Sequence, residues 1–269
     1  MNREDYYISK MKNRYIGDDG AVINDMIYSM DSFCENIHFK REWMSLYQIA
    51  QKSMIVNISD AIAMNAKPKF ALISISLPKN ITTTEIDQLT KGFKDIANEY
   101  NCEIIGGDTV AGDKIDISIT IISQSDNPLL RKGLKAGDIL AYTGELGESK
   151  RDLNRLFQNL PISNSSKFIK PILRADFIYN MRKHLRVGMD ISDGLFCDTN
   201  KLLQINNLGA KLTKDIDKSI YSSGEEYEML IGFEPSKLDI LKSYGLKLTP
   251  FATIIEDINL LDCQNHHFK

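Results

Sequence analysis

Residues 45–65 combine the apolar spacing of an α-helix with a lone carboxylate, and this combination limits how the chain can fold. Ser45 is suited to cap the helix. The apolar residues recur at helical spacing: Leu46, Ile49, Ala50, Met54, Ile55, Ile58, Ala61 and Ile62. Asp60 then projects from a mostly apolar helix, where a carboxylate must be paired, capped or bound to a metal. Asp60 is therefore the acidic residue that is hardest to explain as a surface charge.

Asp60 belongs to one of five short segments in which an acidic residue stands beside a small or turn-forming residue. The segments are Gly17-Asp18-Asp19-Gly20, Ser29-Met30-Asp31, Asn57-Ile58-Ser59-Asp60, Gly106-Gly107-Asp108-Thr109 and Asp190-Ile191-Ser192-Asp193-Gly194. Taken singly, each is most simply a helix cap or a tight turn, because Asp, Gly and Ser are the usual turn residues. Five together favour a site for hard cations, since Mg²⁺ prefers carboxylate, water and phosphate oxygens.

Size and charge narrow the class of protein. The 269 residues, 43% of them hydrophobic, suffice for one large or two medium domains. A net charge of −3 gives no basic surface, so we expect no nucleic-acid partner. We also expect a cytosolic protein without a membrane partner. No stretch reaches the roughly 18 apolar residues of a spanning helix, and residues 1–14 lack the apolar core of a signal peptide.

The four cysteines, Cys34, Cys102, Cys197 and Cys263, show no Cys-x-x-Cys spacing. We therefore expect them to be reduced and mostly packed, without a disulfide framework or a structural zinc site. The four histidines are not spaced as zinc ligands, and no Ser-His-Asp or Cys-His catalytic set is apparent.

Strand and helix patterns are mixed along the chain. In the first half we expect strands at 21–23, 26–30, 69–78, 103–105 and 115–123, and a second helix over 85–100 capped by Thr84. In the second half we expect helices over 150–160, 174–184 and 196–206, and strands over 139–143, 211–212, 229–233 and 251–255. This mixture favours an α+β second unit over a strict βαβ alternation.

A turn-rich stretch, residues 125–128, separates the alternating strand at 115–123 from the second half. We place a domain boundary there, which gives domains 1–126 and 127–269. A single large domain is the alternative.

Several residues bear on phosphate or substrate binding. Gly106-Gly107 offers backbone N–H groups for an anion, whereas no P-loop or Rossmann glycine pattern occurs. The segment at 144–147 follows a strand but lacks the full glycine pattern, so we interpret it as a turn, with phosphate contact as the lesser alternative. Arg131 is either a surface charge or a bidentate phosphate ligand. His38 is a structural histidine or a ligand, and Glu225 marks a helix start or faces a cationic substrate.

Seven motifs occur in order along the chain: Gly-Asp-Asp-x-Ala-Val (17–22), Asp31 with Glu35 and His38-Phe39, Asn-x-Ser-Asp-x-x-Ala-Met-x-Ala-x-Pro (57–68), Gly-Gly-Asp-Thr (106–109), Arg131-Lys-Gly with Gly137-Asp138, Asp190-x-Ser-Asp-Gly-Leu and Gly224-Glu-x-Tyr-Glu. As a group and in this order, they resemble the motifs of thiamine-monophosphate kinase. Together they cover nearly the whole chain, and seven motifs in one order are far more specific than any single short pattern.

The resemblance implies a two-domain fold similar to that of aminoimidazole ribonucleotide synthetase. Its N-terminal α/β domain binds ATP and Mg²⁺ and forms a dimeric β-barrel-like interface, and its C-terminal domain is α+β. The implied protein is a homodimeric kinase that transfers the γ-phosphoryl group of ATP directly to thiamine monophosphate, with several Mg²⁺ ions and no covalent phosphoenzyme.

The same resemblance implies roles for individual residues. The implied metal ligands are Asp19, Asp31, Asp60, Asp108, Asp190 and Asp193, with Ser29 as a backbone or hydroxyl ligand and Met30 through its main-chain oxygen. The implied contacts to ATP are Gly107, Asp108, Arg131, Ser192 and Tyr100, and those to thiamine monophosphate are His38 and Glu225. No general base is implied, because the acceptor phosphate is already ionised.

The chain departs from the family pattern at a few positions. Met30 replaces the usual threonine, and Glu226 stands where the family has aspartate. The family often ends in Gly-Tyr-x-His-Phe beside a substrate-stacking aromatic residue, whereas residues 263–268 here read Cys-Gln-Asn-His-His-Phe. The second half is also short for the family.

Two alternatives stay open. One is a related ATP-dependent enzyme acting on another phosphorylated small molecule. Of these, selenophosphate synthetase is disfavoured by the lack of a reactive cysteine and lysine pair near the N-terminus. The other is a catalytically silent nucleotide-binding or maturation protein, which would not need five acidic segments.

Overall fold

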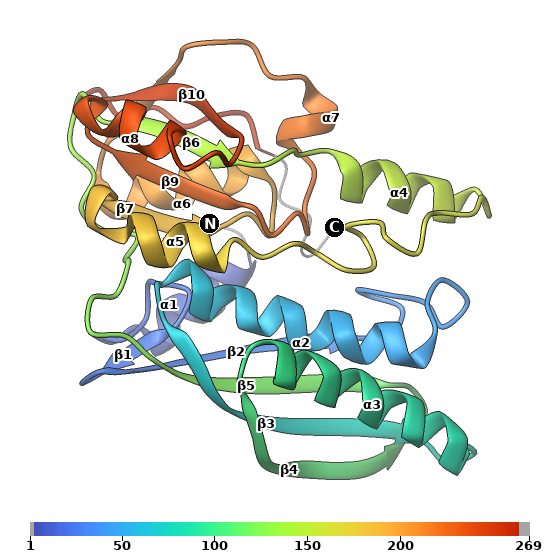
Figure 1. Cartoon of the computed structure of the whole chain (residues 1–269). Coiled ribbons are helices and arrows are strands. Elements are labelled where there is room, and N and C mark those ends of the chain that lie inside the picture. Colours follow the sequence, from blue (N-terminus) through green and yellow to red (C-terminus); the bar gives the residue numbers. More distant parts are fainter. Residues whose placement is uncertain (1–2, 264–269) are drawn as a thin grey trace.

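A computed structural model of the protein describes residues 3–263. It contains two five-stranded sheets, with helices between and around them (Figure 1). The first sheet is built from residues 21–124 and the second from residues 139–255. The first sheet ends at Gln124 and the second begins at Ile139, while one cluster of buried residues runs through both halves, so the domain boundary at 126 stays a prediction.

The first sheet has the strand order β1-β2-β5-β3-β4. Its strands are β1 (Ala21–Ile23), β2 (Met26–Cys34), β3 (Lys67–Pro78), β4 (Glu103–Gly112) and β5 (Asp116–Gln124). Only β3 and β4 pair in parallel, because helix α3 (Thr83–Glu99) connects them. The isoleucines of β5 alternate as predicted, with Ile117, Ile119 and Ile121 buried.

Helix α2 (Leu46–Ala63) lies between the first sheet and the second half of the chain (Figure 1). Ser45 caps it as predicted, in a capping box with Gln48. The predicted cap of α3 is wrong by two residues. Thr82, and not Thr84, accepts from the N–H of Glu85, whose side chain reaches back to the N–H of Thr82.

The second sheet is antiparallel throughout, with the order β7-β9-β6-β10-β8. Its strands are β6 (Ile139–Thr143), β7 (Val187–Asp190), β8 (Gly209–Leu212), β9 (Met229–Phe233) and β10 (Leu248–Ile255). The accompanying helices are α4 (Glu148–Phe157), α5 (Ala175–Met181), α6 (Leu195–Asn206), α7 (Lys218–Tyr221) and α8 (Leu238–Lys242), with 3₁₀ turns at Arg182–His184 and Pro235–Lys237. A further helix, α1 (Arg3–Met11), precedes the first sheet.

Two of the acidic segments lie within strands and not in turns, contrary to expectation. Residues 29–31 belong to β2 and residues 106–108 to β4. The glycines of β4 permit this because the strand passes very close to β3. A Cβ atom at Gly107, where φ is +154°, would lie 1.7 Å from the carbonyl oxygen of Ile73. Gly107 therefore marks a close approach between the two strands.

One face of the first sheet is not covered by helices. Tyr28 and Phe70 both lie opposite Ile122 of β5, and Met30 and Leu72 both lie opposite Thr120. These four residues, on the two strands that flank β5, are 37–61% exposed. The single chain thus presents an open, largely apolar sheet face.

The expectation that all cysteines are reduced is wrong for one pair. Cys197 of α6 and Cys263 form a disulfide across 66 residues, whereas Cys34 and Cys102 are free. Hydrogen bonds between Asn200 and Leu261 in both directions hold the two segments together, so the pairing follows from tertiary structure and not from sequence spacing. Within residues 3–263, no helix is long and apolar enough to cross a membrane.

Candidate functional site

Three carboxylates from three distant segments meet where the two halves of the chain join. Asp19 lies in the loop before β1, Asp60 near the end of α2 and Asp190 at the end of β7. One carboxylate oxygen from each lies within 4.8 Å of the others. Two of these segments come from the first half and one from the second, so the site spans both halves.

Short hydrogen bonds hold these segments in place. The hydroxyl of Ser59 on α2 donates to Asp190 Oδ2 over 2.6 Å, which joins the two halves at the site. The side chain of Asn57, two residues earlier, accepts from the N–H of Asp31 over 2.8 Å and ties β2 to the same helix. Helix α2 thus positions Asp31 of the first sheet and Asp190 of the second.

Burial, and then the approach of like charges, raises the pKa values of three carboxyl groups at the site. Burial, together with Asp19, raises the pKa of Asp190 to about 8. The pKa of Asp60 is also raised, first by burial and then by Asp31, Asp190 and Asp19. Asp31 lies at the edge of the cluster, where partial loss of hydration and its acidic neighbours raise its pKa to about 6. The cluster therefore lacks positive charge for the number of carboxylates it holds.

Asp193 lies beside the cluster and is bound by a lysine. Lys201 Nζ contacts Asp193 Oδ2 over 2.6 Å and Asp198 Oδ1 over 2.8 Å. Asp198 Oδ2 accepts in turn from the N–H groups of Ser192 and Asp193, both over 3.0 Å. Asp198 and Lys201 of α6 therefore fix the loop that carries the predicted ligands Ser192 and Asp193.

The donor atoms at the cluster fit a hard divalent cation. Asp19 Oδ2 and Ser29 Oγ are buried and have no hydrogen-bond partner in the described structure. All the side-chain donors are oxygens, which suit Mg²⁺ better than a soft metal. A cation at this point would satisfy the orphaned oxygens and reduce the repulsion between Asp19, Asp60 and Asp190.

Not every predicted ligand reaches the cluster within one chain. Asp108 and Gly107 lie on the edge strand β4, three strands away from Asp31 on β2, or about 14 Å at the usual strand spacing. The side chain of Met30 is 61% exposed on the open sheet face, so only its main chain could serve. Tyr100 is the C-cap of α3, where burial and then Glu99 and Asp176 raise its pKa to about 12.

Arg131 is not an exposed surface charge, because its side chain lies against Asp19 of the cluster. Its guanidinium group pairs with Asp19, and its backbone N–H donates to Asp18 Oδ1 over 2.7 Å. Its Nε is buried without a partner. Arg131 therefore already binds the loop that carries Asp18 and Asp19, and its Nε is left for a further acceptor.

The two predicted substrate residues, His38 and Glu225, contact a buried pair made of Phe33 and Lys52. His38 stacks on Phe33, with ring centroids 5.5 Å apart, and its Nδ1 accepts from the N–H of Cys34. Glu225 Oε2 contacts Lys52 Nζ over 2.6 Å, and Lys52 lies over the ring of Phe33 at 5.6 Å. Of the two alternatives for Glu225, the helix start is wrong, because residues 225–228 form a loop that leads into β9.

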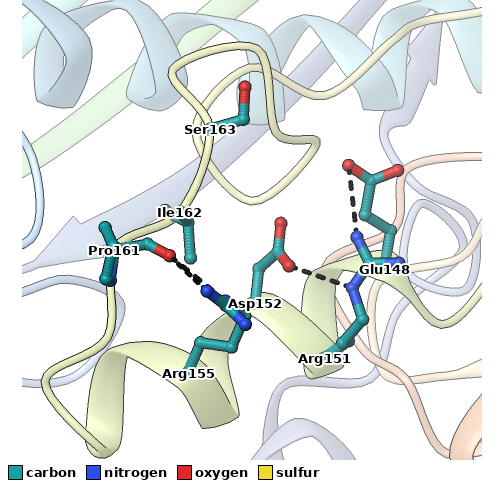
Figure 2. Close-up of a pocket in the computed structure, with 7 residues that line it drawn as sticks. All are labelled: Glu148, Arg151, Asp152, Arg155, Pro161, Ile162 and Ser163. Atoms are coloured by element: carbon teal, nitrogen blue, oxygen red, sulfur yellow. Dashed lines mark hydrogen bonds and ion pairs between the residues drawn. The ribbon is translucent and has the colours of Figure 1, made fainter.

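Two hollows lie along α4, away from the carboxylates. One of about 400 Å³ is lined by Arg151, Arg155 and the loop at 161–163 (Figure 2). The other, of about 740 Å³, is lined by residues 145–148 and by residues of α4 and α7. The N–H of Gly147 donates to Glu226 Oε1 over 2.8 Å, so in the segment at 144–147 this N–H already has a partner within the protein.

Sequence reasoning missed several residues that shape the site. Ser59 lies inside a recognised motif without an assigned role, and Asp198 and Lys201 follow a recognised motif on α6. Lys52 had a visible signal, since it is a charged residue in the apolar helix. It is fully buried.

The fold and the carboxylate site define a protein of the AIR synthase-related class. Residues 17–124 match the family model described as AIR synthase related protein, N-terminal domain. Solved structures agree in fold. AaThiL complexed with AMPPCP and TMP has a TM-score of 0.86 at 24% identity, covering 96% of this chain and 91% of that one. A HypE-HypF complex has a TM-score of 0.79 at 18% identity, covering 97% and 99%.

Curated relatives narrow the class to one family. Thiamine-monophosphate kinase of Buchnera aphidicola subsp. Schizaphis graminum is 35% identical, covering 84% of this chain and 78% of the relative. The enzyme of Bacillus subtilis is 31% identical over 84% and 70%, and that of Aquifex aeolicus is 28% identical over 82% and 81%. The chain belongs to the thiamine-monophosphate kinase family. The predicted family, fold class and enzyme class are confirmed, whereas the barrel-like interface stays a prediction.

Proposed function

We propose that this protein transfers the γ-phosphoryl group of ATP directly to thiamine monophosphate, with the help of Mg²⁺, to give thiamine diphosphate and ADP. The observation that carries the proposal is the meeting of Asp19, Asp60 and Asp190 at the junction of the two halves, in a chain of this family. Two polyanions have to be brought together in this reaction, so charge neutralisation and alignment are the main requirements.

Bound Mg²⁺ would neutralise phosphate oxygens and align the donor and acceptor groups. Its ligands would be Asp19, Asp31, Asp60 and Asp190, with Ser29 and the main-chain oxygen of Met30 nearby and Asp193 for a further ion. The chain's own contribution is rigidity: Ser59 and Asn57 fix the carboxylates and the strand around them.

In the reaction, an oxygen of the thiamine monophosphate phosphate group bonds to the γ-phosphorus of ATP. The bond from that phosphorus to the β,γ-bridging oxygen breaks, and ADP leaves with the bonding electrons. No proton has to be removed from the acceptor, because the attacking phosphate is ionised, so no general base is assigned. Arg131, through its unpartnered Nε, and Ser192 would contact ATP.

A homodimer accounts for the residues that lie far from the cluster. The open sheet face with Tyr28, Met30, Phe70 and Leu72 would be covered by a second copy of the chain. The partner could then supply Gly107 and Asp108 from its β4, and Tyr100, to the ATP side of the site. Gel filtration with light scattering would test this, with a dimer as the expected mass.

The organic part of the substrate would lie between His38 and Glu225. Thiamine monophosphate carries a cationic thiazolium ring and an aminopyrimidine, so a carboxylate and an imidazole N–H are suitable partners. The family's C-terminal aromatic residue cannot be assigned a counterpart, because residues 264–269 lie outside the described part of the chain.

An acceptor screen tests the proposal. ADP release is measured with Mg²⁺-ATP and, in turn, thiamine monophosphate, thiamine, and other phosphorylated small molecules. We expect turnover with thiamine monophosphate alone. Turnover only with another acceptor would favour a related enzyme of the same class, and nucleotide binding without any turnover would favour a silent binding protein.

A further inference from the structure

Lys52 is a charged residue in the middle of the mostly apolar helix α2, and yet it is completely buried. Its side chain is 0% exposed, and its only ion pair within residues 3–263 is with Glu225, at 2.6 Å. A buried ammonium group is tolerated only with such a partner. The pair joins α2 to the loop before β9, and so joins the two halves of the chain a second time.

The pair is asymmetric in its exposure. The Glu225 side chain is 27% exposed, so the carboxylate reaches the surface of the site while its cation stays inside. Aromatic rings enclose the ammonium group, with Phe168 at 4.1 Å and Phe33 at 5.6 Å from their ring centroids. Oxygen Oε2 of Glu225 is taken by Lys52, and no hydrogen bond to Oε1 occurs among the described residues.

The backbone of Glu225 is fixed as firmly as its side chain. Its φ angle is +53°, in the left-handed region that a glutamate seldom adopts. Its N–H donates to the carbonyl of Ser192 over 2.7 Å, and the preceding Gly224 approaches the same carbonyl. The main chain of Glu225 is thus bound to the loop after β7, which carries Ser192, while its side chain is bound to Lys52 of α2.

Lys52 also lies on the face of α2 that serves the carboxylate cluster. Ser59, which donates to Asp190, is seven residues further on and therefore lies nearly above Lys52 on the helix. A single helix face thus holds Asp190 through Ser59 and Glu225 through Lys52. Phe33 lies between Lys52 and His38, so the two substrate residues share one support.

We propose that Lys52 is a positioning residue for thiamine monophosphate: it holds Oε2 of Glu225 so that Oε1 is presented to the organic part of the substrate. This inference rests on the proposed function and adds a residue to it. Lys52 itself touches neither substrate. Its loss should therefore weaken binding of thiamine monophosphate, while ATP binding and the transfer step are retained.

The test compares steady-state kinetics of the wild type and K52M with both substrates varied. We expect K52M to raise KM for thiamine monophosphate about tenfold, with kcat and KM for ATP within about threefold of the wild type. In K52M/E225Q the rise should be no larger than in E225Q alone, because both changes remove the same interaction. Additive rises, or a K52M effect on ATP instead, would overturn the inference.

A matched control is R186M, which removes the cation from the buried Asp138 far from the site, where Arg186 Nε lies 3.0 Å from Asp138 Oδ1. It should lower the unfolding temperature without changing KM for either substrate. A loss of stability in K52M with an unchanged KM for thiamine monophosphate would mark Lys52 as merely structural.

E225D provides a second test of the proposal if K52M does not fold. The charge is retained, but the carboxylate held by Lys52 is drawn back from the site by one methylene. We expect KM for thiamine monophosphate to rise at least about fivefold, and an unchanged KM would contradict positioning by Lys52. A wild-type protein that makes no thiamine diphosphate overturns the proposed function itself, whereas an active wild type with unaltered variants overturns this inference alone.

Discussion

Asp60 brings a carboxylate into an apolar helix, against two other carboxylates. Burial and the neighbouring Asp31, Asp190 and Asp19 raise its pKa, so the folded chain holds it at a free-energy cost that a bound cation would offset. We expect D60N to lower kcat by at least about a hundredfold, because a metal ligand is lost. The unfolding temperature without metal should not fall, since the amide removes a repulsion.

Product formation and thermal unfolding check this prediction in the same preparation. D126N is the control, because Asp126 is exposed and lies outside the cluster. Wild-type activity in D60N would remove Asp60 from the metal site.

The pKa of Asp190 predicts how the stability of the metal-free protein depends on pH. The pKa of Asp190 is raised to about 8 from 3.8, so the ionised form is disfavoured in the folded state. Well below pH 3.8 the group is protonated in both states and its contribution is neutral. As pH rises through the interval up to about 8, the unfolded chain ionises more readily, and this group makes folding progressively less favourable.

We therefore expect the stabilisation by Mg²⁺, measured as the rise in unfolding temperature over a sample with chelator, to be larger at pH 8 than at pH 6. In D190N this difference should largely disappear. An equal Mg²⁺ effect at both pH values in the wild type would contradict the assigned shifts.

Sequence motifs identified Asp19, Asp60 and Asp190, which meet, but not the residues that hold them. A carboxylate in an apolar helix has few explanations, so Asp60 could be recognised from local sequence. Ser59 and Lys52 act on residues 131 and 173 positions away. No local pattern predicts such partners, because they depend on how the two halves pack.

Among the elements, regular patterns were predicted well. The helix at 45–65 and the alternating strand at 115–123 appear as α2 and β5. The patterns failed where tertiary contact decides the structure. Strand β4 continues through Gly106-Gly107 because it lies against β3, and β7 was missed because its four residues are all buried and show no alternation.

The start of α3 gives a direct test at this scale. Thr82 forms the capping box with Glu85, whereas Thr84 lies inside the first turn and is exposed. We expect T82A to lower the free energy of unfolding by about 1 kcal/mol. T84A should change it by less than about 0.5 kcal/mol. Urea unfolding of both variants measures the difference, and equal effects would contradict the assigned cap.

At the scale of the whole molecule, the disulfide between Cys197 and Cys263 closes a loop across 66 residues. We expect C263S to lower the free energy of unfolding under oxidising conditions by about 4 kcal/mol, from the restricted unfolded chain. With reductant the wild type and the variant should be equally stable. Thiol titration should find two reactive thiols in the unfolded, oxidised wild type, and four would contradict the bond.

The two halves of the molecule meet at the carboxylates, and this junction is the basis of the account. Asp190 comes from the second sheet, and Asp19 and Asp60 come from the first half. Neither half alone would hold the complete site. A reaction that needs two phosphorylated molecules brought together is consistent with this arrangement.

The most direct measurement is ³¹P nuclear magnetic resonance of the purified protein with ATP and thiamine monophosphate, recorded with Mg²⁺ and again with excess chelator. With Mg²⁺ we expect the γ-phosphate signal of ATP to be replaced by the two phosphate signals of thiamine diphosphate together with those of ADP. With chelator, no thiamine diphosphate should form. Thiamine diphosphate formed at the same rate in chelator, or ATP consumed without it, would contradict the central claim.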